Sequence, residues 1–229
     1  MKHSVNAGSS EVHIPVADGE FIAASQYLPA QPRGLVLFAH GSGSSRMSPR
    51  NQFVAQVLQQ AGFGTFLFDL LTVQEDALDR QTAELRFDID LLADRLVTAT
   101  RWVRQQAGLE SVPLGYFGAS TGAAAALVAA AAVPSTVAAI VSRGGRPDLA
   151  GVHLRAVRAP TLLIVGGADT QVITLNRRAM ESLRVENELV IVPGATHLFE
   201  EPGALEAAAR FARDWFVRQF TASEGRSSP

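Results

Sequence analysis

The chain has no cysteine among its 229 residues. Disulfide bonds, a thiolate nucleophile and zinc held by cysteine are therefore excluded. A domain of this length buries roughly 70% of the surface of its unfolded chain, so it needs neither a disulfide nor a metal to fold. Because 47% of the residues are hydrophobic and 18% are charged, we expect a globular protein with its own core and no metal.

Blocks of like charge and long apolar runs are missing as well. Twenty basic and 22 acidic residues are spread along the chain and give a net charge of −2, which argues against a nucleic-acid or membrane partner. The longest apolar run, Ala123–Val133, has 11 residues, well short of the roughly 20 that span a bilayer. Residues 1–10 lack the apolar centre of a signal peptide. We expect a soluble, cytoplasmic protein, whose oligomeric state the sequence does not predict.

Strand patterns divide the chain near its start. Glu11–Val16 and Phe21–Leu28 are typical of a hairpin with a turn at Asp18–Gly19. From Gly34 on, short apolar runs alternate with helical patterns, as in parallel strands that are covered on both faces. These runs are Leu35–Ala39, Thr65–Phe68, Leu114–Phe117, Val137–Val141, Thr161–Val165 and Leu189–Val192. The patterns predict an α/β fold, with a mostly parallel sheet between helices and an antiparallel N-terminal hairpin.

The helical patterns between the strands have readable ends. Ser48 is a suitable cap for a helix that begins at Pro49 and ends at Gly62. A longer helix is predicted over Leu85–Val103, where apolar residues recur every three or four positions and Arg86 falls on the wet side.

The body of the chain contains no repeat and no linker. We therefore predict one domain over residues 11–220, ending in a helix at about 204–220. The two ends, residues 1–10 and 221–229, are small and polar and are predicted to be disordered.

A G-x-S-x-G motif spans Gly118–Gly122, with Ser120 at its centre. It follows the predicted strand Leu114–Phe117 directly and precedes an alanine-rich helix at Ala123–Ala132. A sharp strand-to-helix turn lifts the serine hydroxyl above the sheet edge and aims a helix N-terminus at it. A chance match is the alternative in a chain with 19 glycines, but the flanking elements favour Ser120 as a nucleophile.

A serine nucleophile needs a base. His197 lies just past the last predicted strand and before the final helix. Because parallel strands end at one edge of the sheet, this position brings His197 to the same edge as Ser120. We predict His197 as the general base, and the alternative is a loop histidine in contact with water.

The acid that orients the base is expected between nucleophile and base in the chain. Asp169 follows the next-to-last predicted strand and fits this position. Asp148 is the competitor, although it could instead pair with Arg143 or Arg146 nearby. We predict Asp169.

The tetrahedral intermediate of acyl transfer needs preorganised N–H donors for its oxyanion. One predicted donor is the backbone N–H of Thr121, which follows the nucleophile. The loop His40–Gly43 comes after the strand Leu35–Ala39, and Ser42 is predicted to supply the second donor. A flexible linker is the alternative for this loop, which the preceding strand disfavours. Asp69 also ends a strand and is predicted to fix a loop.

These residues, in the order nucleophile, acid and histidine, together with the His40–Gly41 loop, resemble the α/β-hydrolase superfamily. Thr161–Asp169 and Pro193–Phe199 are most similar to its dienelactone-hydrolase-like branch, and the resemblance covers about residues 11–220. It implies a hydrolase without a cofactor. Dienelactone hydrolases use a cysteine nucleophile, whereas this chain has Ser120. We therefore expect a carboxylesterase-type activity through an acyl-enzyme rather than hydrolysis of dienelactone.

Many members of the superfamily carry a helical lid after the sixth strand. Here Ser142–Ala159 is too short for a cap domain, so we expect an open site for small or water-soluble esters. Arg143 and Arg146 lie at the active edge, where they could hold a substrate carboxylate. A salt bridge to Asp148 is the simpler expectation.

Two other functions fit the same residues. A cofactor-free perhydrolase, similar to haloperoxidases, would use the same triad to make peracids. A non-catalytic binding module on a hydrolase fold is less favoured, because it would normally have lost a triad residue. Fold alone does not decide between them.

Overall fold

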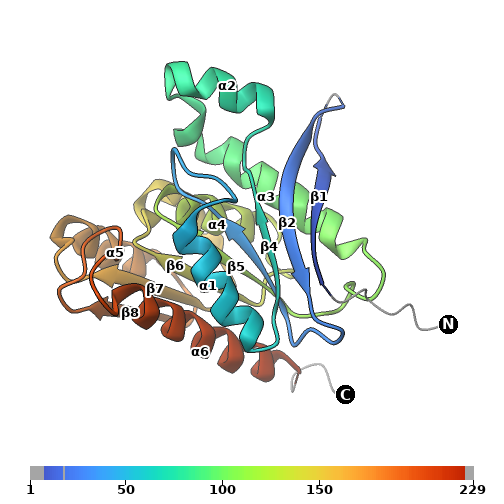
Figure 1. Cartoon of the computed structure of the whole chain (residues 1–229). Coiled ribbons are helices and arrows are strands. Elements are labelled where there is room, and N and C mark those ends of the chain that lie inside the picture. Colours follow the sequence, from blue (N-terminus) through green and yellow to red (C-terminus); the bar gives the residue numbers. More distant parts are fainter. Residues whose placement is uncertain (1–7, 18, 225–229) are drawn as a thin grey trace.

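The computed structural model describes residues 8–17 and 19–224. Within these residues, eight strands form one sheet in the order β1-β2-β4-β3-β5-β6-β7-β8 (Figure 1). Strands β3 to β8 run parallel, and the β1–β2 hairpin joins β4 in antiparallel pairing. The strands are β1 (Gly8–Pro15), β2 (Phe21–Leu28), β3 (Leu35–Ala39), β4 (Gly64–Phe68), β5 (Leu114–Ala119), β6 (Ala139–Arg143), β7 (Thr161–Gly166) and β8 (Asn187–Val192).

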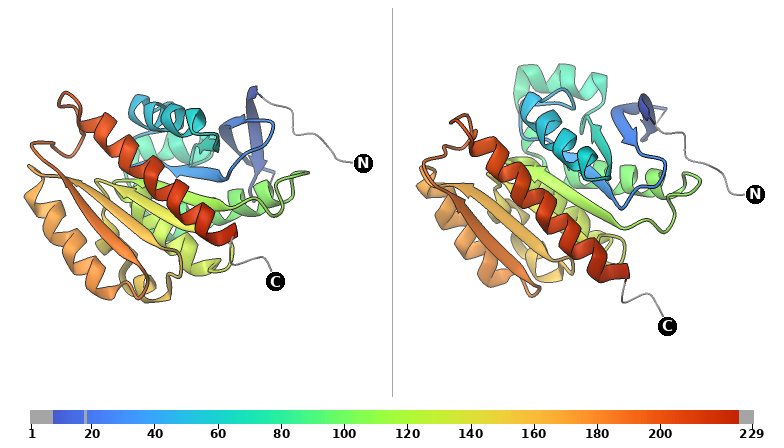
Figure 2. Two further views of the ribbon diagram at one scale, coloured as in Figure 1. Left: turned by 90° about the horizontal axis from the view of Figure 1, so that it is seen from below. Right: turned by 60° about the horizontal axis from the view of Figure 1, so that its bottom comes forward.

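Helices cover both faces of the sheet, as the sequence predicts (Figures 1 and 2). Helices α1 and α6 pack together on one face, while α3, α4 and α5 lie on the other. No cap domain is present in the part of the chain that the structure describes. The helices are α1 (Pro49–Gln60), α2 (Val73–Thr82), α3 (Ile89–Arg104), α4 (Thr121–Ala132), α5 (Thr170–Ser182) and α6 (Ala204–Glu224), with two 3-10 helices, η1 (Leu85–Phe87) and η2 (Pro147–Ala156).

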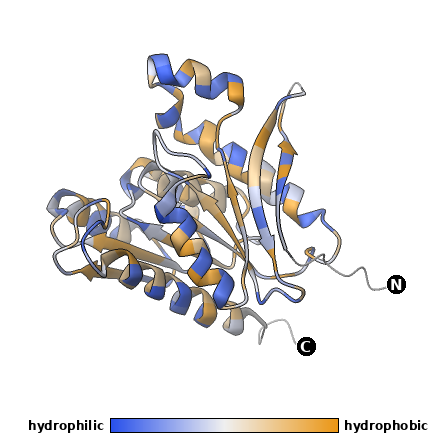
Figure 3. Ribbon diagram, in the orientation of Figure 1, coloured by the Kyte–Doolittle hydropathy of each residue, from blue (hydrophilic) through white to orange (hydrophobic). Residues whose placement is uncertain are grey.

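The central strands β3 to β7 are buried along their whole length, and Figure 3 shows them coloured mostly as hydrophobic. Apolar side chains form one core on each face of the sheet. Under α1 and α6 the rings of Phe63, Phe216 and Phe220 meet at centroid distances of 5.5 to 6.4 Å. Each large apolar side chain buried in this way contributes about 1.5–3 kcal/mol. Gly115 of β5 permits this packing, since a Cβ there would lie 2.6 Å from the Phe216 ring.

Helix α4 contains the longest apolar run of the chain. Its residues from Thr121 to Ala130 are all buried. Small alanine side chains let α4 pack closely against α3 on one side and the sheet on the other. Among the described residues, no helix has the length and apolar character needed to cross a membrane.

The segment between β4 and α3 differs from the prediction. The single helix predicted over Leu85–Val103 is wrong at its start, where the first residues form η1. Asp88 begins α3 anew by accepting a hydrogen bond from the Leu91 N–H at 3.0 Å. The helix before it, α2, was not predicted, and a capping box between Thr72 and Glu75 fixes its start.

Both ends of the chain are more regular than predicted. Strand β1 begins at Gly8, because its backbone pairs with β2 over eight residues. Helix α6 continues through Glu224. The rest of the predicted disordered tails, and Asp18 of the predicted hairpin turn, lie outside the described residues.

Candidate active site

Ser120 lies at the tight turn between β5 and α4. Its backbone has φ 51° and ψ −122°, a conformation that costs a non-glycine residue about 1–3 kcal/mol. Glycines on both sides make the turn possible. A Cβ on Gly118 would overlap the backbone of Ala123, and one on Gly122 would overlap the carbonyl of Ala39.

Backbone hydrogen bonds hold this strained turn against β6 and the loop that follows it. The Ser120 N–H donates to the Arg143 carbonyl at 3.2 Å, and the Ser120 carbonyl accepts from the Arg146 N–H at 3.1 Å. Ser120 is therefore fixed by β6, the neighbouring strand of the sheet, as well as by α4.

The loops after β7 and β8 bring Asp169 and His197 to Ser120. His197 Nε2 lies 3.3 Å from Ser120 Oγ, and His197 Nδ1 lies 2.7 Å from Asp169 Oδ2. Because a carboxylate only accepts, Nδ1 carries the proton and Nε2 can accept the serine proton. The Asp169 side chain is 15% exposed and that of His197 is 38% exposed, so the acid is shielded while the imidazole faces the open side.

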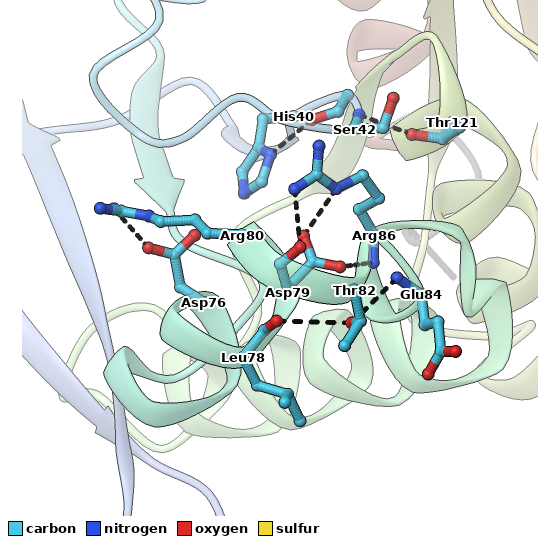
Figure 4. Close-up of polar contacts among 11 residues, drawn as sticks. His40, Ser42, Asp76, Leu78, Asp79, Arg80, Thr82, Glu84, Arg86 and Thr121 are labelled. Atoms are coloured by element: carbon cyan, nitrogen blue, oxygen red, sulfur yellow. Dashed lines mark hydrogen bonds and ion pairs between the residues drawn. The ribbon is translucent and has the colours of Figure 1, made fainter.

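Ser42 and Thr121, the two predicted oxyanion donors, contact each other directly. The Ser42 N–H donates to Thr121 Oγ1 at 2.8 Å (Figure 4). The loop His40–Gly43, called the oxyanion loop below, lies against Ser120, since a Cβ on Gly41 would be 3.0 Å from Ser120 Cβ. Thr121 is the first residue of α4, so its N–H has no acceptor within the helix. It is available to an oxyanion, whereas the Ser42 N–H already serves the Thr121 hydroxyl.

His40 is a structural part of this loop. The residue is 9% exposed, with ring Nδ1 2.9 Å from the Gly41 carbonyl and Nε2 accepting from the Leu70 N–H at 3.1 Å. These partners require a neutral ring with the proton on Nδ1. Burial lowers the pKa of His40, although the Gly41 carbonyl and nearby aspartates act to raise it. His40 thus ties the oxyanion loop to the chain after β4.

Asp69 also fixes the loop between β3 and α1. Its Oδ1 accepts from the Arg46 N–H at 2.8 Å, and its Oδ2 lies 3.5 Å from Arg46 Nε. This is the loop-fixing position that the sequence suggests for Asp69.

Arg143 and Arg146 are placed differently from each other. Arg146 forms two hydrogen bonds with Asp148, at 2.9 and 2.8 Å, which is the salt bridge that the sequence favours. Arg143 is 7% exposed; it lies near the rings of Phe117 and Phe199. Burial, with a smaller effect of nearby Arg50, lowers the pKa of Arg143 to about 10, so it keeps its charge at neutral pH.

A cavity of about 780 Å³ opens beside the oxyanion loop, between this loop and the α2–η1 segment. Arg86 lines it and donates from Nε to Asp79 Oδ2 at 2.7 Å (Figure 4). The long helix predicted around Arg86 is wrong, because Arg86 lies in η1, where its side chain is 25% exposed and pairs with Asp79. The Thr72–Glu75 capping pattern could have revealed α2, but no sequence pattern pairs Asp79 with Arg86. In the described part of the chain, no group of three or more histidines and carboxylates could hold a metal ion.

Comparison with known proteins shows the family of this chain. A model of the dienelactone hydrolase family matches residues 22–221. The chain belongs to this family. A crystal structure of a dienelactone hydrolase from Anabaena variabilis is 55% identical, with a TM-score of 0.90, over 93% of this chain and 98% of that one. The chain has the α/β-hydrolase fold of this family.

More distant structures share the fold alone. Est1E from Butyrivibrio proteoclasticus is 14% identical, with a TM-score of 0.75, and the match covers 92% of this chain and 99% of that one. Two curated relatives from strains of Mycobacterium tuberculosis, both named putative phosphoribosyl transferase, are 58% identical over 196 residues. This match covers 86% of the present chain but 43% of each relative. The chain therefore spans less than half the length of these relatives.

Proposed function

We propose that this family member is a serine hydrolase that cleaves carboxylic esters through an acyl-enzyme. The observation that carries the proposal is the hydrogen-bonded series Ser120, His197 and Asp169, contributed by three separate loops at one sheet edge. The series contains a nucleophile, a base and an orienting acid, which are the parts that acyl transfer by serine requires.

In the first half of the reaction, Ser120 Oγ attacks the carbonyl carbon of the ester while its proton moves to His197 Nε2. Asp169 holds the imidazole in the required tautomer and stabilises the imidazolium. The tetrahedral intermediate then collapses, the bond to the leaving oxygen breaks, and His197 returns the proton to that oxygen. The alcohol leaves, and the acyl group stays on Ser120.

The oxyanion of this intermediate is bound by the N–H groups of Thr121 and Ser42. The Thr121 N–H is available, whereas the Ser42 N–H must turn from the Thr121 hydroxyl or be shared with it. A fully charged oxygen is the stronger acceptor, so it competes well with a neutral hydroxyl. One such donor is worth about 10²–10³ in turnover.

Water completes the cycle. His197 takes a proton from a water molecule, whose oxygen attacks the acyl carbonyl; Ser120 then leaves and recovers its proton. The half-exposed imidazole admits water from the open side. This exposure also supports small or water-soluble esters as substrates.

The test combines active-site labelling with a panel of 4-nitrophenyl esters of increasing acyl length. We expect a fluorophosphonate probe to label Ser120, and Ser120→Ala to lose about a million-fold in turnover. Ser135→Ala is the matched control, because Ser135 is exposed at the far end of α4, and it keeps full activity. A folded wild-type protein that neither reacts with the probe nor hydrolyses any ester of the panel would contradict the proposal.

Peracid formation is the second activity that this triad supports, with peroxide in place of water as the attacking group. Adding hydrogen peroxide to the ester assay distinguishes the two. We expect ester hydrolysis to remain the faster reaction, and peracid formation that exceeds hydrolysis would replace the esterase assignment by a perhydrolase.

A further inference from the structure

The cavity beside the oxyanion loop has the size of a small-molecule site. Its volume of about 780 Å³ lies within the roughly 300–1,000 Å³ that is usual for ligand pockets. Gly41, which lies next to Ser120, lines the cavity together with Ser42, and Arg86 of η1 lines it as well. Leu71 and Leu92 contribute apolar surface to the lining.

The position of the cavity relative to His197 decides which part of an ester it receives. The leaving oxygen must lie near His197 Nε2, because that atom returns the proton. No residue of the loop 193–203, which carries His197, lines the cavity. The cavity is lined instead by the oxyanion loop, which contacts the acyl carbonyl. It therefore receives the acyl chain.

Arg86 is held rigidly in the wall of this cavity. Asp79 accepts three of its hydrogen bonds: from the Arg86 N–H at 2.9 Å and from Nε at 2.7 Å on the carboxylate, and from Nη2 at 2.9 Å on the backbone carbonyl (Figure 4). The remaining nitrogen, Nη1, donates to no acceptor in the described part of the chain, and it faces the oxyanion loop, where a Cβ on Gly43 would lie 3.4 Å away.

The charges around Nη1 favour an uncharged acceptor. The Asp79 side chain is 3% exposed and forms an ion pair with Arg86, so the guanidinium carries little excess charge into the cavity. Two further carboxylates line it, Asp69 and Asp76, which pair with Arg46 and Arg80. A second anion would lose its hydration and face these carboxylates, whereas a carbonyl oxygen loses little water.

From this arrangement we infer that the cavity is the acyl subsite, that Arg86 Nη1 donates a hydrogen bond to an uncharged oxygen on the acyl chain, and that the preferred substrates are esters of oxo acids. The inference rests on the proposed esterase function and specifies its substrate class. Nη1 is fixed before the substrate arrives, so the bond costs little side-chain entropy.

The experiment measures kcat/KM for three kinds of 4-nitrophenyl ester of equal chain length. One acyl chain is plain, one carries a ketone at the fourth, fifth or sixth carbon, and one ends in a carboxylate. For the wild type we expect the best oxo ester to exceed the plain ester by about tenfold, a discrimination that a hydrogen bond to a charged donor can supply. We expect the carboxylate ester to fall below the oxo ester.

Variants of Arg86, with a control at an arginine outside the cavity, identify the donor. Arg86→Met should bring the ratio of oxo to plain ester close to one. Arg86→Lys is the second variant; it retains a positive charge beside Asp79 but has no second branch to reach the cavity, and it should lower the ratio in the same way while keeping the fold. In Arg101→Met the ratio should keep its wild-type value, because Arg101 is exposed on α3 and does not line the cavity.

Each contrary result has a separate meaning. Ester hydrolysis with an unchanged ratio in both Arg86 variants would overturn the Arg86 subsite and leave the esterase function in place. A wild-type preference for the carboxylate ester that disappears in Arg86→Met would overturn the uncharged acceptor. Failure of the wild type to cleave all three esters would overturn the proposed function and this inference with it.

Discussion

Helices α4 and α2 both border the candidate site, but they are held in opposite ways. In α4 every residue from Thr121 to Ala130 is buried, so the apolar core fixes the helix that begins behind Ser120. In α2 the buried residue is Asp79, and Val73 and Leu78 are 80% and 53% exposed. Core packing thus supports the reacting groups, whereas a capping box and ion pairs support the wall of the acyl cavity. Substitutions on the two sides should differ accordingly.

The largest expected effect is on the catalytic side. Asp169→Asn should lower turnover by around ten-thousand-fold, because an amide no longer fixes the proton on His197 Nδ1 or stabilises the imidazolium. Asp148→Asn is the matched control. It disturbs only the pairing with Arg146, so it should change turnover by less than about tenfold, since a partly exposed pair contributes about 1 kcal/mol or less. Steady-state kinetics and circular dichroism of both variants check this, and a severe loss in the Asp148 variant alone would reassign the acid.

The next largest difference is expected between the effects of substitutions in α4 and α2 on the free energy of unfolding. Ala125 is fully buried in α4, so Ala125→Leu should lower the free energy of unfolding by about 1–3 kcal/mol through overpacking. Leu78→Ala on the exposed side of α2 should change it by less than about 0.5 kcal/mol. Urea unfolding curves measure both. Equal losses would show that α2 contributes to the core as much as α4 does.

A smaller effect is expected from the cap of α2. Thr72→Ala removes the side chain that accepts from the Glu75 N–H, a loss of about 0.5–2 kcal/mol for the helix. Because α2 forms the cavity wall, KM for long acyl esters should rise while kcat for a short ester stays the same. Thr72→Ser keeps the cap and should behave as the wild type. A fall in kcat for every ester would instead place the cap among the requirements for the chemical steps.

The smallest effect concerns pH and His40, which joins the oxyanion loop to the chain before α2. Burial lowers the pKa of His40 in the folded protein, whereas an unfolded histidine titrates near about 6.5. The stability that the neutral ring contributes is therefore complete above about pH 6.5, and it decreases as the pH falls from there toward the folded pKa. The difference in thermal midpoint between wild type and His40→Asn should shrink from pH 8 to pH 5. A constant difference would mean that His40 does not titrate with unfolding.

The sequence predicts those parts of the molecule that depend on local signals. The parallel strands have continuous apolar runs, and the Ser120 turn has glycines on both sides, so both could be placed in advance. The same holds for His197 and Asp169, because their positions follow from strands that all end at one edge. The geometry of these residues in the structure is the one that the proposed chemistry needs.

The wall of the cavity could not be predicted, because long-range polar contacts determine it. Helix α2 has no apolar stripe to reveal it, and the apolar spacing of α3 continues upstream past Asp88, which hides the break before that helix. Arg86 therefore seemed to face solvent, whereas Asp79 holds it in the wall. The hydrogen bond between Ser42 and Thr121 was equally out of reach, since 79 positions separate the two residues.

Residues 70–88 connect β4 to α3 and add no strand to the sheet. Ser120, His197 and Asp169, the proposed nucleophile, base and acid, all lie outside this stretch. Part of the cavity lining, Arg86 included, therefore comes from a segment separate from the one that carries Ser120, while the loop His40–Gly43 lines the cavity as well. A graft of another loop and helix between β4 and α3 would exchange the acyl preference while the triad keeps its own supports. For protein engineering, the segment 70–88 is the natural unit of replacement.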